Sequence, residues 1–235
     1  PCYIRINEAE GSVATTGVEF CVFMEAIPEK PIGLLMLKGY PVNALFDAHT
    51  YLEYVPGKQM PAFMQEDVYG FGDFCWADFK SVDSIGKLTD EELAELLFAA
   101  HMKRPLRKPF IDSLENLYLY FSHDDAHWVK IYMRDTKAYK TVIEHKIRSE
   151  LMGRKRSMNQ IPQELLDEVN CLLSDGGIFD FERVSPEIDG VSIYPAKGVE
   201  FDADDLHKEL DRQRNIFGNH RFLEYNARTK KWMLW

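Results

Sequence analysis

Two imidazoles and two carboxylates fall within five consecutive residues of this chain, in the tract SHDDAHW at 122–128. Side chains of these types bind zinc and other divalent ions, and they also transfer protons near neutral pH. The four candidate metal ligands are His123, Asp124, Asp125 and His127. The segments on either side, Leu117–Ser122 and Trp128–Arg134, are rich in β-branched and aromatic residues, so we expect the tract to join two strands of a hairpin.

The length of the hairpin loop decides whether the two histidines can share a metal ion. With a loop of two or four residues, Ser122 is expected opposite His127, which places His123 and His127 on opposite faces of the hairpin. With a three-residue loop, the two histidines stand opposite each other. A simpler interpretation is that the two aspartates only form the turn. We therefore expect no cofactor, with a divalent metal ion in this tract as the alternative.

Aromatic residues gather before and within the same hairpin. The run VYGFGDFCWADF at 68–79 is the most aromatic stretch of the chain, and its two glycines suggest a strand that is bent or closely approached. Most of these rings are expected in the core. An exposed set would instead form a surface for a partner protein. The candidate residues for that surface are Tyr69, Phe71, Trp76 and Trp128.

The charges are unevenly distributed along the chain. The formal net charge is −10, yet residues 100–156 carry 13 lysines and arginines against 7 acidic residues. The candidate anion-binding residues are Arg104, Arg107, Arg154 and Arg156. A duplex-binding domain is usually basic overall, so we do not expect nucleic acid as a partner. The acidic surface is better matched to a basic protein partner.

Several classes of protein are excluded by what the sequence lacks. It contains no GxxxxGK[ST] phosphate loop, no HExxH zinc motif and no GxSxG nucleophile elbow. Its longest apolar stretches are far shorter than the roughly 20 residues of a membrane span. The four cysteines are widely spaced and form no CxxC motif, which is typical of reduced thiols in the cytoplasm.

Strands and helices occur in clusters rather than in regular alternation, which predicts an α+β fold with a mainly antiparallel sheet and about four helices packed on it. The helices are expected over 89–103, 136–152, 162–173 and 202–217, and strands include 2–7, 18–26, 33–38 and the two hairpin arms. We expect a single domain over 1–235. The polar stretch 154–160 offers an alternative division into 1–153 and 161–235.

Two segments, MPAFMQEDVYGFGDFCWADF at 60–79 and LYLYFSHDDAHWVKIYMRD at 117–135, resemble segments of an uncharacterised family of soluble proteins from Gram-positive spore-forming bacteria. The resemblance covers about the first 145 residues. Some members carry the label oxalate:formate antiporter, which a chain without a membrane span contradicts. The resemblance implies a bacterial, cytoplasmic protein and supplies no activity.

From these observations we expect a non-catalytic binding, regulatory or inhibitor-type protein that acts through an acidic, aromatic surface. The alternative is a metal-dependent hydrolase that uses His123, Asp124, Asp125 and His127. A concave pocket with convergent polar groups would favour the enzyme, and a flat, exposed aromatic patch would favour the binding protein.

Overall fold

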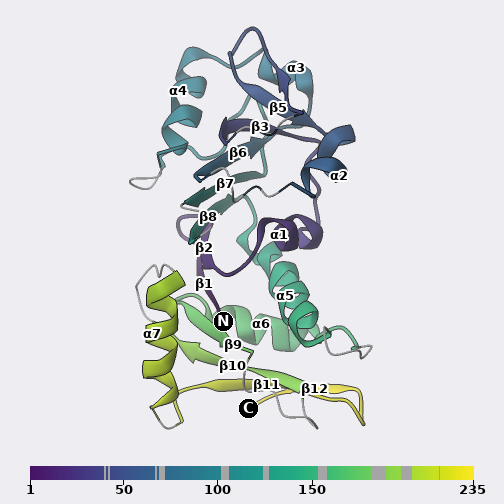
Figure 1. The fold of residues 1–235 in the computed structure, drawn as a ribbon, viewed down its shortest axis with the longest axis vertical. Coiled ribbons are helices and arrows are strands. Elements are labelled where there is room, and N and C mark those ends of the chain that lie inside the picture. The colour runs from purple at the N-terminus through teal and green to yellow at the C-terminus, as the bar shows by residue number, and fades with distance from the viewer. Residues whose placement is uncertain are drawn as a thin grey trace. The chain divides into compact units, whose positions relative to one another are not determined.

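A computed structural model of the protein describes residues 1–39, 41, 43–66, 68, 72–101, 106–123, 127–152, 158–181, 189–196, 203–216 and 218–235 (Figure 1). The chain forms two compact units. The first unit contains residues 1–8, 14–28 and 137–235, and the second contains residues 9–13 and 29–136. The expectation of a single domain, and its alternative division near 153–161, stay predictions. Residues 153–157 lie outside the described part.

The second unit is built on strands in the order β8-β7-β6-β3-β5-β4. Their bounds are β3 Gly33–Lys38, β4 Leu45–Phe46, β5 Glu53–Pro56, β6 Phe74–Asp78, β7 Tyr118–His123 and β8 Trp128–Met133. Neighbouring strands in this order pair antiparallel. The helices of this unit are α2 Met60–Phe63, α3 Val82–Ile85 and α4 Asp90–Ala99.

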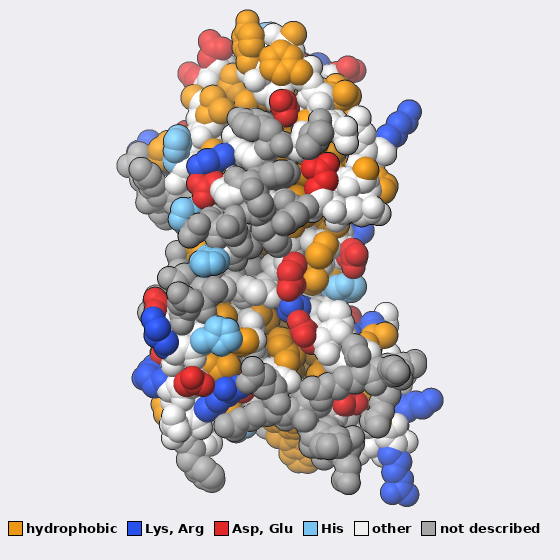
Figure 2. Space-filling model, viewed as in Figure 1, with side chains coloured by type: hydrophobic (Ala, Val, Ile, Leu, Met, Phe, Trp, Pro, Cys, Tyr) orange, Lys and Arg blue, Asp and Glu red, His pale blue; other side chains and the backbone are white. Residues whose placement is uncertain are grey.

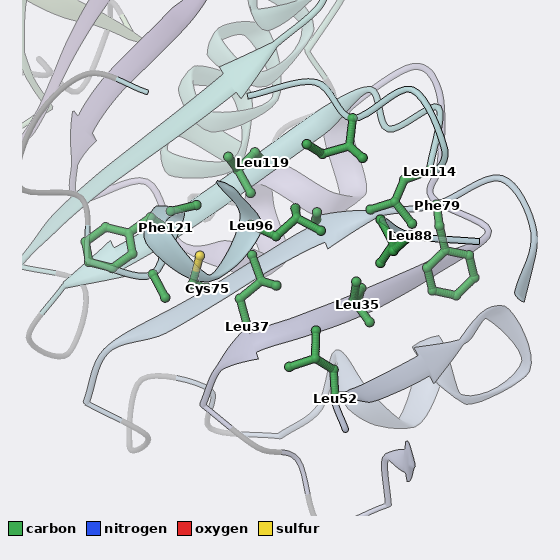
Figure 3. Packing of buried hydrophobic residues seen from close by; sticks show 14 of the residues in the cluster. Leu35, Leu37, Leu52, Cys75, Phe79, Leu88, Leu96, Leu114, Leu119 and Phe121 are labelled. Carbon is green, nitrogen blue, oxygen red and sulfur yellow. The ribbon is translucent and has the colours of Figure 1, made fainter. Parts of the chain in front are cut away.

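One apolar cluster forms the core of the second unit, with side chains from strands and helices that face one another (Figure 3). Leu35 and Leu37 of β3 and Leu119 of β7 meet Leu96 of α4. Their alternation along the strands places one face of the sheet against the helix. This arrangement buries Cys75 of β6 completely, and burial raises the pKa of its thiol far above the ordinary value.

Helix α4 begins with the capping arrangement that its sequence predicts. The Thr89 hydroxyl accepts a hydrogen bond from the Glu92 N–H, and the Glu92 carboxylate accepts one from the Thr89 N–H. Each contact satisfies an amide that has no partner inside the helix. The predicted position of this helix is thereby confirmed, and the helix ends at Ala99 rather than near residue 103.

The first unit has strands in the order β12-β11-β10-β9-β1-β2. Their bounds are β1 Cys2–Asn7, β2 Ser12–Thr16, β9 Gly177–Asp180, β10 Asp189–Pro195, β11 Arg221–Asn226 and β12 Lys231–Leu234, and the first two residues of β2 belong to the second unit. Its helices are α1 Phe20–Ala26, α5 Lys140–Met152, α6 Gln163–Leu172 and α7 Ala203–Arg214. Leu206 and Leu210 of α7 pack against Tyr3, Ile178 and Tyr194.

The α+β class and the largely antiparallel pairing are confirmed, whereas the helix count is wrong. The described residues form seven α-helices instead of about four, because three short ones escaped prediction. The predicted strand at 18–26 is α1, in which Phe20, Phe23 and Met24 are buried. That spacing places all three on one helical face, but a run of seven residues is too short for periodicity to separate helix from strand. No helix in the described ranges has the length and apolarity needed to cross a membrane.

Candidate functional site

The predicted hairpin is present as β7 and β8. His123 pairs with Trp128 and Ser122 pairs with Val129, so the loop contains the four residues 124–127. The expected registers paired His127 with Ser122 or with His123. In the structure His127 instead lies in the loop, and Trp128 stands opposite His123. Asp124 and Asp125 lie outside the described residues, so their part in a metal site stays a prediction.

His123 is hydrogen-bonded to a carboxylate that sequence reasoning missed. Its Nδ1 atom lies 2.6 Å from Oδ1 of Asp73, which precedes β6. The other carboxylate oxygen of Asp73 forms an ion pair with Lys38 at the end of β3. Lys38 and His123 end the two strands that pair with β6, and Asp73 directly precedes β6. The pairing of three strands therefore assembles a lysine, an aspartate and a histidine.

This group leaves one imidazole nitrogen of His123 available. The Asp73 carboxylate holds Nδ1, and the His123 side chain is 59% exposed, which leaves Nε2 for a proton, a metal ion or a ligand. A carboxylate on the far nitrogen is the usual support of histidines that bind metals. Within the described ranges, however, no three His, Cys, Asp or Glu side chains are placed to hold a metal ion.

The four residues proposed as an aromatic partner surface have different positions. Trp76 is completely buried and its ring stacks on Tyr120, with centroids 5.3 Å apart. It therefore does not belong to an exposed surface, contrary to our expectation, because the central strand β6 is covered. Trp128 is half-buried and packs edge-on against Phe121. Tyr69 and Phe71 lie outside the described residues.

The predicted anion-binding residues remain untested as a group. Arg107 is exposed in the second unit. Arg104, Arg154 and Arg156 lie outside the described residues. The prediction that the basic clusters bind an anion therefore stays a prediction.

An exposed aromatic surface does exist, but at a place that sequence reasoning passed over. Phe46 is 59% exposed and Tyr51 is 78% exposed, and their rings meet edge to face with centroids 6.3 Å apart. Leu45 beside them is also exposed. Figure 2 shows hydrophobic side chains gathered on the surface of the second unit. We call Leu45, Phe46 and Tyr51 the aromatic edge.

The turn that carries this edge is fixed by one carboxylate. Oδ1 of Asp47 accepts hydrogen bonds from the N–H of His49 and from both the N–H and the hydroxyl of Thr50. Burial acts to raise the pKa of Asp47, but these hydrogen bonds prevail and hold it below its ordinary value. Tyr51 then adopts φ 60°, a left-handed conformation that is uncommon outside glycine. The sequence signal was the Asp47–Thr50 spacing after an apolar pair, which is typical of an Asx turn.

No family model matches the chain, and no curated protein or solved structure shows significant similarity to it. The resemblance of residues 60–79 and 117–135 to a family of spore-forming bacteria therefore stays an expectation.

Proposed function

We propose that this chain is a non-catalytic binding protein that holds a basic, extended segment of a partner protein along β4 and against the aromatic edge. The observation that carries this proposal is the contact between two largely exposed aromatic rings, Phe46 and Tyr51, on a turn fixed by Asp47. Large exposed rings are enriched where proteins bind one another.

The position of β4 explains why the partner segment would be extended. This strand ends the strand order of its unit, so one of its sides has no neighbouring strand among the described residues. Such a side presents backbone N–H and C=O groups that can pair with an added strand. Both residues of β4 are exposed, which leaves their side chains accessible to the same partner.

The net negative charge of residues 43–66, the segment that contains β4, favours a basic partner. Between residues 43 and 66 the chain has Asp47, Glu53 and Glu66 against Lys58, and its whole net charge is −10. Complementary charge steers association and discriminates against like-charged competitors. A turn that is already fixed also reduces the ordering cost of binding.

The test is a selection of random displayed peptides on the intact protein, followed by affinity measurements. We expect selected peptides that combine alternating apolar residues with lysine or arginine, and binding that weakens as salt rises. The double variant Phe46→Ser with Tyr51→Ser should bind at least about tenfold more weakly. A matched double variant, Val82→Ser with Leu97→Ser, removes two other exposed apolar side chains of the same unit and should bind normally. Equal binding by both double variants, or selected peptides without basic residues, would contradict the proposal.

Hydrolysis assisted by a divalent metal ion is a second candidate function, which the hydrogen bond between Asp73 and His123 favours. In this alternative, His123 binds the ion through Nε2, and Asp124, Asp125 and His127 supply further ligands. The ion would activate a water molecule.

Metal content separates the two functions. Elemental analysis of the purified protein should be repeated on His123→Ala with His127→Ala, and on the control His49→Ala with His101→Ala, which removes two exposed histidines of the same unit. Near-stoichiometric metal that only the first variant loses would support hydrolysis. Absence of metal, with thermal stability unchanged by divalent ions, would contradict it.

A further inference from the structure

A pocket of about 240 Å³ lies in the first unit, beside the ends of α6, β10 and β11. Its apolar wall is formed by Leu172, Ile193 and Pro195. Gly177 also lines it, and a Cβ atom there would lie 2.6 Å from a methyl group of Leu173. The close approach of Leu173 therefore requires a residue without a side chain at this position.

An arginine and a histidine lie beside this apolar wall. His220 and Arg221 both line the pocket and are exposed, and none of the described lining residues is acidic. Among the described residues, neither side chain has an ion pair or a side-chain hydrogen bond. In a chain with net charge −10, two uncommitted groups of this kind beside one pocket favour an anionic ligand.

The Tyr194 ring lies beside His220 at this pocket. Tyr194 is 1% exposed and is one of the residues that line the pocket. The His220 ring packs on the Tyr194 ring, with centroids 5.0 Å apart, so the two groups lie together.

The segment that carries His220 and Arg221 is held in place by hydrogen bonds. Gln213 at the end of α7 is buried, and its Oε1 accepts a hydrogen bond of 2.5 Å from the Asn219 amide. Its own amide donates to Glu209, one turn earlier in the helix. This chain of contacts fixes Asn219, the residue before His220, so the pocket is organised without a ligand.

We propose that this pocket binds a small organic monocarboxylate with one aromatic ring or one branched aliphatic group. The apolar body lies against Leu172 and Ile193, and the carboxylate accepts hydrogen bonds from Arg221 and His220. Guanidinium groups suit this role because they bind carboxylates in a bidentate manner.

The volume sets the size of the ligand. An apolar cavity of about 150 Å³ is known to hold benzene. Pockets for drug-sized molecules extend from about 300 Å³ upward. A pocket of about 240 Å³ therefore has room for a single ring with a carboxylate.

The test uses NMR titration of the intact protein with benzoate, phenylacetate and isovalerate, and follows the imidazole signals of His220. Benzamide serves as the neutral counterpart of benzoate, and inorganic phosphate as an anion without an apolar body. We expect saturable shifts with at least one carboxylate and much weaker ones with benzamide and phosphate. No saturable shift with any carboxylate, or equal affinity for benzamide or phosphate, would overturn the proposal.

Three variants assign the binding to this pocket. Arg221→Gln should weaken binding at least about tenfold, since it removes a charge-assisted hydrogen bond. Leu172→Trp should block the pocket while Arg221 and His220 remain. Arg228→Gln, an exposed arginine outside the pocket, should leave the affinity unchanged. If Arg228→Gln and Arg221→Gln weaken carboxylate binding equally, the effect comes from the overall charge of the protein, and the proposed site is wrong.

Discussion

The backbone N–H of Tyr118 donates a hydrogen bond of 2.6 Å to Oδ1 of Asp78, on the neighbouring strand. The Leu117 N–H donates to the same carboxylate. Asp78 is 3% exposed, and this burial prevails over the hydrogen bonds and raises its pKa from 3.8 to about 6. Asp78 is therefore a buried acid that titrates close to physiological pH.

We predict that Asp78 makes the protein less stable as pH rises from about 4 to about 6. In that interval the folded state retains a proton that the unfolded state has released, so the free energy of unfolding falls with pH. The decrease is at most about 3 kcal/mol for a pKa shift of this size. Asp78→Asn should flatten the dependence, as measured by urea unfolding at several pH values. Asp83→Asn, at an exposed site, is the control. If the free energy of unfolding changes with pH in Asp78→Asn as it does in Asp83→Asn, Asp78 is not the source of the pH dependence.

Two arginines of α7 should differ sharply in their importance. Arg214 binds the fully buried carboxylate of Asp180 through two hydrogen bonds of 2.9 Å, whereas Arg212 pairs with Glu209 at the surface. Arg214→Gln leaves a buried charge without its main partner and should cost about 2–4 kcal/mol. Arg212→Gln should cost much less, because solvent screens an ion pair formed by an exposed arginine. Chemical denaturation measures both, and equal costs would contradict the structural difference.

The buried lysine of α5 should make the protein sensitive to high pH. Lys146 Nζ lies 2.9 Å from Glu19 and 2.7 Å from Glu150, with a side chain only 7% exposed. Burial acts to lower the pKa of Lys146, but the hydrogen bonds that its ammonium group donates to these carboxylates raise the pKa above its ordinary value. The stabilisation is thus complete below the unfolded pKa of about 10.4 and is lost as pH rises through the folded pKa.

Lys146→Met should accordingly be less stable at neutral pH, and should lose less further stability in alkaline solution. Thermal unfolding from neutral to strongly alkaline pH checks this, with the more exposed Lys140→Met as the control. If the unfolding temperature falls equally with rising pH in the unmodified protein and in both variants, Lys146 is not the source of the alkaline destabilisation.

Removing the capping hydrogen bonds at the start of α4 should have a smaller effect on stability. Thr89→Ala removes one capping hydrogen bond and should cost about 1 kcal/mol. Glu92→Ala should cost more, because this carboxylate also accepts hydrogen bonds from the N–H and the hydroxyl of Ser113. Glu91→Ala is the matched control on the same turn. Urea unfolding measures the stability of the three variants. A larger loss of stability in Glu91→Ala than in Glu92→Ala would contradict the capping role of Glu92.

Local features were the predictable part of the fold. The capping box at Thr89 and the hairpin arms around residues 118–133 depend on neighbouring residues, so the sequence determines them directly. Helix α1 was mistaken for a strand because its buried residues span less than two turns. The short strands β4 and β5 left too few residues for an alternating pattern.

The candidate site was predictable only in part. His123 was identified from its neighbours, but its partner Asp73 lies 50 residues earlier in the chain. Their contact depends on the pairing of β6 with β7, which no local pattern specifies. Phe46 is exposed because β4 ends the strand order of its unit. Trp76 is buried because β6 lies in the middle of that order.

The interleaving of the two units along the chain has a consequence for protein synthesis. Residues 29–136 form nearly all of the second unit, so its core residues are complete before β9 has been made. Strand β1, in contrast, pairs Cys2 with Phe179 and must wait for most of the chain to be translated. Contacts between such distant residues form slowly, and domains fold as their residues become available. Strand β1 therefore gains its neighbour β9 only late in synthesis, and a ribosome that stalls within α6 would carry a chain in which β1 still lacks that neighbour.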